Sequence, residues 1–186
     1  MSSGSAGRLG RYDGSKLTAK LAHAIRRGYG GTVDAGAMVK IRELIETDWP
    51  AVVRIHDAAR PDELRGSCDG RAFIPLEQDP EVEALRACRI LVATQADRVV
   101  GFAGIDGSYL GWLYVNPADY GQGIGRGLLR AALDLARGGP PWTIVLAGNL
   151  PAIRLYESEG FEQAARFGSD NAGYPCTCLR MEQPAG

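Results

Sequence analysis

A glycine-rich junction between a strand and a helix constrains the fold of this chain more than any other segment. Residues 109–115 form a strand-like run, and residues 123–137 place apolar side chains on one helical face. We call the connection between them, residues 121–126, the glycine loop. Because glycine has no Cβ, the free N–H groups of a first helical turn can approach an anion closely there. The junction therefore predicts a strand–turn–helix unit with an anion-binding site at the turn.

Two common nucleotide-binding patterns do not fit the glycine loop. A Walker A loop needs Gly-Lys followed by Ser or Thr, and here Arg126 and Gly127 follow Gly125. The dinucleotide fingerprint needs Gly or Ala where Arg126 stands. From this segment alone, glycines that serve only a tight strand-to-helix turn are an open alternative.

The remaining pattern predicts an α+β fold over residues 39–186, with a mixed, mainly antiparallel central sheet flanked by helices. Strand-like runs come first as a meander and later alternate with helices. Asp106, Gly107 and Ser108 join two of the runs, and Asp-Gly favours a tight hairpin turn. Strands are predicted at residues 39–45, 90–94, 99–105, 109–115, 143–147, 161–167 and 176–181; helices at 47–61, ended by Pro61, and at 80–88, 123–137 and 151–159.

Residues 1–38 differ from the rest and are predicted to be an N-terminal leader. They combine Gly-Ser punctuation with a Gly-rich exit at residues 28–31. Apolar residues recur at helical spacing within residues 16–27, which predicts either one short helix or a disordered tail.

Charge and composition exclude several classes of protein. The chain has 21 Lys and Arg against 22 Asp and Glu, a formal net charge of -1, so nothing attracts it overall to nucleic acid or an anionic membrane. No run approaches the roughly 20 apolar residues of a spanning helix, and no secretory signal pattern opens the chain. We therefore expect a cytoplasmic protein. The 4 cysteines lack the spacing of a disulfide framework or metal site, and no metal is predicted.

A second motif makes the interpretation specific. Asn149, Ala152, Tyr156, Gly160 and Phe161 fit the pattern Asn-x-x-Ala-x-x-x-Tyr-x-x-x-Gly-Phe. The glycine loop, which comes earlier in the chain, fits [Gln/Arg]-x-x-Gly-x-[Gly/Ala] except for Tyr120 at the first position. In these two motifs and their order the chain resembles the GCN5-related N-acetyltransferases (GNAT). The resemblance implies an acyl-CoA N-acyltransferase fold, acetyl-CoA as cosubstrate and transfer of an acetyl group to an amine.

The resemblance also implies roles for individual residues. The backbone of Leu113 and Val115 pairs with the pantetheine arm, and Asn149 hydrogen-bonds it, besides capping the following helix. Tyr156 lies beside the sulfur and is the expected general acid, although a packing role for this tyrosine is an alternative. The predicted cofactor-binding residues are Leu113, Val115, Gly121, Gln122, Gly123, Ile124, Gly125, Arg126, Asn149, Ala152 and Tyr156.

The general base and the acceptor site are less directly indicated. Many relatives carry Glu on the strand equivalent to residues 109–115, which here contains no carboxylate. Asp106 in the hairpin and Glu46 after the first strand are the candidate bases. Residues 168–175, between the last two strands, are the predicted loop that forms one acceptor wall. The predicted substrate-binding residues are Trp112, Tyr114 and Tyr174.

We therefore expect an acetyltransferase acting on a primary amine of a small molecule or peptide. Acetylation of a protein N-terminus or lysine is the alternative, and a non-catalytic CoA-binding sensor is an alternative of another class. Aminoacyl-tRNA is a further hypothesis, because basic residues concentrate in the leader. No membrane partner is expected, and the exposed final strands are compatible with a homodimer.

Overall fold

A seven-stranded sheet organises the part of the chain that the structure, a computed structural model, describes: residues 38–184. The predicted leader lies outside the described residues, apart from Met38. The strands are β1 (Lys40–Glu43), β2 (Arg89–Gln95), β3 (Arg98–Asp106), β4 (Tyr109–Val115), β5 (Trp142–Leu146), β6 (Glu162–Asn171) and β7 (Tyr174–Glu182). The helices are α2 (Trp49–Leu64), α3 (Val82–Ala87), α4 (Ile124–Leu133) and α5 (Leu150–Ser158), with 3₁₀ turns η2 (Glu46–Asp48), η3 (Gly70–Ala72), η4 (Leu76–Gln78) and η5 (Pro117–Asp119).

The sheet order is β1-β2-β3-β4-β5-β7-β6. Neighbouring strands within residues 38–184 are antiparallel except β4 and β5, which are parallel. The predicted mixed, mainly antiparallel sheet is therefore confirmed. The hairpin at Asp106 is confirmed too, because Gly107 adopts the positive φ of 57° that the turn requires.

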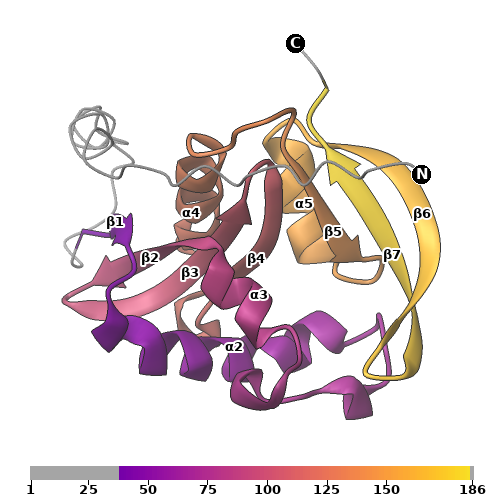
Figure 1. Ribbon diagram of the computed structural model, residues 1–186, viewed down its shortest axis with the longest axis horizontal. Coiled ribbons are helices and arrows are strands. Elements are labelled where there is room, and N and C mark those ends of the chain that lie inside the picture. The colour runs from indigo at the N-terminus through magenta and orange to yellow at the C-terminus, as the bar shows by residue number, and fades with distance from the viewer. Residues whose placement is uncertain (1–37, 185–186) are drawn as a thin grey trace, which may run out of the picture. The chain divides into compact units, whose positions relative to one another are not determined.

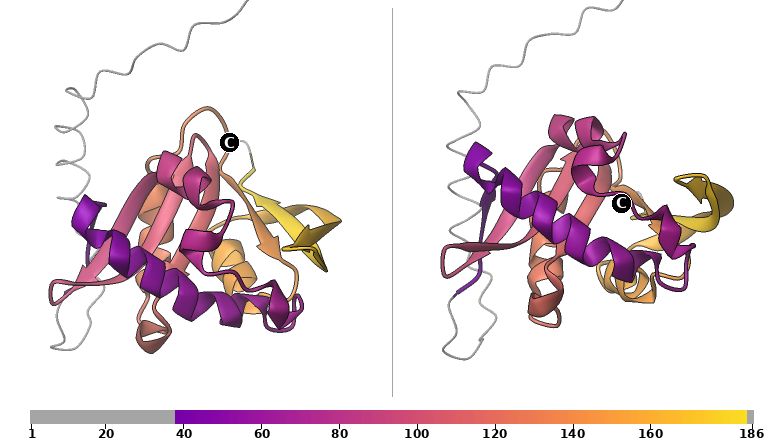
Figure 2. Two further views of the ribbon diagram at one scale, coloured as in Figure 1. Left: turned by 60° about the horizontal axis from the view of Figure 1, so that its bottom comes forward. Right: turned by 90° about the horizontal axis from the view of Figure 1, so that it is seen from below.

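Helices cover both faces of the sheet, as Figures 1 and 2 show: α2 and α3 on one face, α4 and α5 on the other. Alternate residues of each strand point to opposite faces, so two apolar clusters form. Leu128 and Leu129 of α4 pack with Tyr156 of α5 in one cluster, while Val52 and Ile55 of α2 pack with other strand residues in the second. Within the described residues, no helix is long and apolar enough to cross a membrane; the cytoplasmic location stays a prediction.

Three predicted boundaries were wrong. Pro61 does not end the first long helix: α2 continues to Leu64, since Pro61 forfeits only one N–H and its carbonyl still accepts from Arg65 N at 3.2 Å. The helix predicted to reach Arg137 ends at Leu133, and the N–H of Arg137 instead donates to Gly107 O at 2.9 Å. The predicted loop at residues 168–175 is mostly paired strand, because β6 and β7 continue to a tight turn at Ala172 and Gly173.

Candidate active site

Strands β4 and β5 touch at one end and separate beyond it. Their backbones pair only at Tyr109 and Trp142 within the described part of the chain, and these two rings stack with centroids 4.3 Å apart. Next to this pair, Thr143 Oγ1 donates to Leu110 O at 2.7 Å. A bulge at Gly111 follows, since Gly104 pairs with Trp112 and Ile105 with Leu110. The strands then run apart toward the carboxyl end of β4 (Figure 1).

The separation leaves backbone groups of β4 unpaired on its β5 side. Asn116 N donates to Val100 O at 2.8 Å, so at this register even-numbered residues of β4 face β3. Backbone groups alternate in direction along a strand, so the N–H and C=O of Leu113 and Val115 point toward β5. These are the two residues predicted to pair with an extended ligand arm. Their free backbone edge is able to hydrogen-bond one.

The glycine loop stands at the end of this open edge. Gly121 and Gly123 adopt φ angles of 76° and 77°, and a Cβ on either would meet no atom within 4 Å. Gly123 is the N-cap of α4. Of the hydrogen bonds among residues 38–184, none has a backbone N–H of residues 121–126 as its donor. Unpaired amides at a helix N-terminus are able to bind a phosphate group, which agrees with the predicted anion site.

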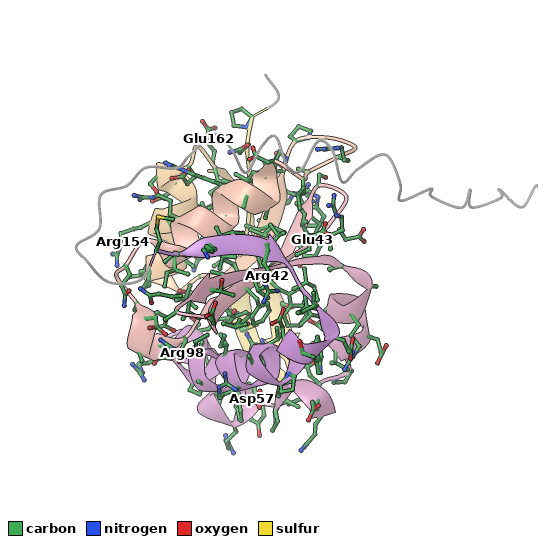
Figure 3. The ribbon with its side chains drawn as sticks, turned by 90° about the vertical axis from the view of Figure 1, so that its left-hand side faces the viewer. Arg42, Glu43, Asp57, Arg98, Arg154 and Glu162 are labelled. Carbon is green, nitrogen blue, oxygen red and sulfur yellow. The ribbon has the colours of Figure 1, made fainter. Side chains whose placement is uncertain are left out.

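An ion pair holds the turn that leads into the glycine loop. Asp119, in η5, is 7% exposed and accepts from Arg98 Nη2 at 2.8 Å and Nη1 at 3.0 Å, and from Asn116 Nδ2 at 2.5 Å. The hydrogen bonds from Arg98 lower the pKa of Asp119, with a further contribution from Asn116. Figure 3 shows Arg98 low in the view, as is Asp57 of α2, whereas Glu162 at the start of β6 lies at the top. The ion pair between Arg98 and Asp119 thus ties the turn before the glycine loop to β3.

The side chain of Arg126, one of the predicted cofactor-binding residues, pairs with residues at the end of α5. Its Nε lies 3.0 Å from Glu159 Oε1, and its Nη2 donates to Ser158 Oγ at 3.1 Å. Arg130 also pairs with Glu159, whose side chain is only 9% exposed. The two arginines thus tie α4 to the end of α5. The contribution of Arg126 to the loop is its backbone N–H in the first helical turn.

Helix α5 places the predicted general acid where β4 and β5 part. Asn149 caps the helix, and its side chain accepts from Ala152 N at 3.3 Å, which confirms the capping role. One turn later, Tyr156 is 6% exposed and its ring packs on Phe161. Burial raises the pKa of Tyr156, a hydrogen bond with Thr143 opposes this shift, and the charge of Glu63 adds to it. The phenol therefore keeps its proton at neutral pH and is suited to donate it.

Neither candidate base lies at the end of its element that is near the site. Asp106 is exposed and pairs with Tyr109, at the end of β4 away from the glycine loop. Glu46 is exposed in η2, just before α2, whereas the C-terminal end of α2 lies near the site. An α-helix of this length spans about 24 Å. The choice of base between these two residues stays a prediction.

The predicted substrate-binding residues lie on the α2 side of the sheet. Trp112 and Tyr114 pack against the cluster that contains Trp49 and Phe102, on the face opposite Leu113, as the strand alternation predicts. Tyr174, at the start of β7, packs near the end of α2, with the Arg71 guanidinium 5.0 Å from its ring centroid. A hollow of about 460 Å³ opens in the same region. It is lined by Pro61, Leu64, Arg65, Cys68, Gly70 and Phe73.

Sequence reasoning missed a charged network at this place. Glu63 of α2 pairs with Arg60 at 2.6 Å and accepts from the Tyr114 hydroxyl at 2.5 Å. Arg60 Nη2 also donates to Asn171 Oδ1, at the tip of the β6–β7 hairpin, at 2.9 Å. The i,i+3 spacing of Arg60 and Glu63 was the only local signal. Within residues 38–184 no group of His, Cys, Asp or Glu could hold a metal ion.

Known proteins resemble this chain in sequence. Residues 86–163 match the acetyltransferase (GNAT) domain family. The peptidyl-lysine N-acetyltransferase YjaB of Salmonella typhimurium is 34% identical over 94 residues, which cover 50% of this chain and 63% of that protein. The N-alpha-acetyltransferase RimI of Mycobacterium tuberculosis is 42% identical over 81 residues, covering 38% and 50% respectively. The chain thus spans about half to two thirds of these relatives' length.

A solved structure extends the likeness over most of the fold. A GCN5-related N-acetyltransferase from Rhodopseudomonas palustris superposes with a TM-score of 0.69 at 20% identity, covering 83% of this chain and 99% of that one. The parted parallel strands, the glycine loop at the N-terminus of α4 and the match over residues 86–163 coincide in one region. Residues 86–163 thus match the GNAT acetyltransferase domain, and the chain has the fold of a GNAT structure.

Proposed function

We propose that this protein is an acetyl-CoA-dependent N-acetyltransferase that acts on a primary amine of a small molecule or peptide. The observation that carries the proposal is the opening between β4 and β5. It joins a free strand edge, a cradle of unpaired amides and a buried phenol in one continuous region. Acetyl transfer needs these three elements to orient a thioester, to hold a pyrophosphate and to protonate a leaving thiolate.

The residues present fit coenzyme A. The six free N–H groups of the glycine loop, the open space beside Gly121 and Gly123 and the helix dipole of α4 favour a pyrophosphate. The backbone groups of Leu113 and Val115 suit the amides of a pantetheine arm, which would bind as an added strand. When bound there, acetyl-CoA would supply the activated acetyl group.

Groups of the protein itself would then orient the thioester and protonate the leaving sulfur. An unpaired β4 amide at the thioester oxygen would polarise the carbonyl, as an oxyanion-hole donor does. The hydroxyl of Tyr156, buried beside Thr143, holds a proton ready for the leaving sulfur. The Tyr156 side chain is shielded from water, since it is buried in the same apolar cluster as Leu128.

Two features bear on the acceptor. The hollow beside Tyr174 is lined mainly by apolar side chains, with Arg65 at its edge, which suits an amine carried on a partly apolar molecule. The second candidate is a protein amine, either a lysine or an N-terminus. It is favoured by the names of the two relatives, one a peptidyl-lysine and the other an N-alpha-acetyltransferase.

Calorimetric titration with acetyl-CoA tests the cofactor site. We expect micromolar binding to the wild type and its loss in Gly123→Glu, whose carboxylate would repel the pyrophosphate. Gly138→Glu is the matched control, because Gly138 also has a positive φ, 90°, and open space, but lies after α4. Equal binding by both variants, or none by the folded wild type, would contradict the proposal.

An amine panel tests the reaction itself. Release of free thiol from acetyl-CoA is measured with small amines, with peptides that offer only an N-terminal amine and with peptides that offer only a lysine. Turnover with any of the three supports the activity and assigns the acceptor class. Binding of acetyl-CoA without turnover on the whole panel would exclude the activity and favour the non-catalytic sensor.

A further inference from the structure

A carboxylate lies against β4 although the strand itself carries none. Glu63, in the last turn of α2, accepts a hydrogen bond from the Tyr114 hydroxyl at 2.5 Å. Tyr114 stands between Leu113 and Val115, the residues whose backbone groups point into the opening beside β5. An α2 residue thereby brings to this strand the type of side chain that the strand lacks.

The position of Glu63 is fixed from several elements. Its carboxylate pairs with Arg60 at 2.6 Å, and Arg60 in turn donates to Asn171 at the tip of the β6–β7 hairpin. The side chains of Arg60 and Glu63 are 13% and 21% exposed. Glu63 is thus held in one orientation while part of it stays open to solvent, which permits proton exchange.

The charge of Glu63 reaches across the sheet opening. It raises the pKa of Tyr156 on α5, after the larger effect of burial, and likewise that of Cys178 on β7. The charge of this α2 carboxylate thus acts on the phenol that α5 supplies from the opposite face. The titratable and charged groups around Glu63 are Arg60 on α2, Tyr114 on β4, Tyr120 after η5, Tyr156 on α5 and Cys178 on β7.

We propose that Glu63 is the general base of this protein and takes a proton from the ammonium group of the acceptor. The proposal rests on the acetyltransferase function proposed above. It assigns the proton acceptor to α2, in place of Asp106 or Glu46. The acceptor amine enters from the α2 side, between Glu63 and the hairpin tip that Arg60 fixes, near the hollow behind Leu64.

The protons and electron pairs balance in this arrangement. The acceptor ammonium gives one proton to Glu63, and the freed lone pair on nitrogen forms the C–N bond. The C–S bond breaks with its electron pair passing to sulfur, which takes the proton of the Tyr156 hydroxyl. The second proton on nitrogen returns to the Tyr156 oxygen. Glu63 releases its proton to solvent, so the products are an amide, a free thiol and one proton.

The test compares two acceptors of different basicity from pH 6 to pH 10: a lysine side chain, pKa about 10.4, and an α-amine, pKa about 8. For Glu63→Gln we expect kcat/KM for the lysine acceptor to fall about 100-fold at pH 7. The loss should be smaller for the α-amine and should shrink as the pH rises, because more of the amine is already neutral. The affinity for acetyl-CoA, measured by calorimetry, should stay within a factor of two.

Controls separate a base from a structural ion pair. Glu77→Gln, an exposed change in η4, should leave both profiles unchanged. Glu63→Asp keeps the charge beside Arg60 and should show a smaller loss with the same pH trend; it replaces Glu63→Gln if that variant fails to fold. Asp106→Asn and Glu46→Gln should retain the wild-type profile.

Two results would overturn the assignment of Glu63. One is a loss in Glu63→Gln that is equal at every pH and for both amines, as expected if the residue only neutralises Arg60. The other is a pH-dependent loss in Asp106→Asn or Glu46→Gln with Glu63→Gln unaffected. In both cases the wild type still acetylates amines, so the proposed function stands. A wild type that binds acetyl-CoA but acetylates no amine would instead remove the function, and with it the need for a base.

Discussion

The Asp119 carboxylate accepts two hydrogen bonds from the Arg98 guanidinium, and this pair joins the turn before the glycine loop to the start of β3. Asp119 is almost fully buried, whereas the side chain of Arg98 is 52% exposed. Solvent therefore screens the charge of Arg98 but hardly that of Asp119. The pair positions the loop without forming part of its phosphate cradle.

Replacing Asp119 by Asn tests this connection. We expect the free energy of unfolding at pH 7 to fall by about 1 kcal/mol and the affinity for acetyl-CoA to fall several-fold. The folded pKa of Asp119 is lowered, so its contribution to stability is present above the ordinary carboxyl pKa of about 3.9 and is lost as the pH falls through the folded value. Denaturant titrations at pH 7 and pH 3 should thus show a smaller acid effect in the variant than in the wild type.

Asp134→Asn serves as the control for that experiment. Asp134 is an exposed carboxylate just after α4, at the end of the helix away from the glycine loop. The same acid dependence in Asp119→Asn and wild type would show that the Arg98 pair does not stabilise the fold.

Removing the hydroxyl of Tyr156 tests the proton donor. In Tyr156→Phe we expect kcat to fall about 100-fold with little change in acetyl-CoA affinity, since the packing of the ring is kept. Burial holds the pKa of Tyr156 above its ordinary value of about 10, so proton donation should persist to at least pH 10. A kcat profile from pH 7 to pH 10 checks this, with Tyr120→Phe for comparison. An unchanged kcat in Tyr156→Phe would assign the proton to another donor.

A methyl group at Gly148 should displace the segment after α2 and so disturb the proposed acceptor site. A Cβ there would collide with Gly66 O and lie 2.6 Å from Ser67 Oγ, in the segment after α2. We expect Gly148→Ala to lose about 1–3 kcal/mol of unfolding free energy and to raise the acceptor KM. In Gly168→Ala a Cβ meets nothing within 4 Å, so its thermal midpoint should match the wild type. Equal midpoints for the two variants would refute the predicted collision.

We expect the Tyr174 ring to affect binding of the acceptor rather than of the cofactor. Tyr174→Ala should raise the acceptor KM about 3- to 10-fold while the affinity for acetyl-CoA stays the same. Phe167→Ala, in the neighbouring strand β6 and 39% exposed, is the control for a lost aromatic ring. Steady-state kinetics with both substrates varied checks the prediction, and an unchanged acceptor KM would remove Tyr174 from the site.

Local patterns explain what could be predicted from the sequence. The glycine loop, the hairpin at Gly107 and the cap at Asn149 each depend on residues a few positions apart, and the structure has all three. Matching motifs also pointed to the family before the fold was known. The stop at Pro61 was wrong because one lost N–H does not outweigh the packing of the last turn of α2.

Contacts between distant residues explain what could not be predicted from the sequence. Tyr114 meets Glu63 across 51 positions, and Arg60 meets Asn171 across 111. No periodicity in the sequence relates such pairs, since the packing of α2 on β4 makes the first contact and the reach of the β6–β7 hairpin to α2 makes the second. For the same reason the sequence did not reveal that the Arg126 side chain pairs with Glu159, the residue just after α5.

Within the described residues, β4 and β5 share a single backbone pair, between Tyr109 and Trp142. This pair divides the sheet into two parts, which we call blades, that are joined at one place. One blade runs from β1 to β4 and the other comprises β5, β7 and β6. Beyond the hydrogen bonds from Trp142 N to Ser108 O and from Thr143 Oγ1 to Leu110 O, no ladder joins the blades in residues 38–184, so these bonds, the stacked rings and helix contacts set the angle between them. Natural variation in the β5–β7–β6 blade is therefore able to retune which amine enters, while the blade that carries the glycine loop stays unaltered.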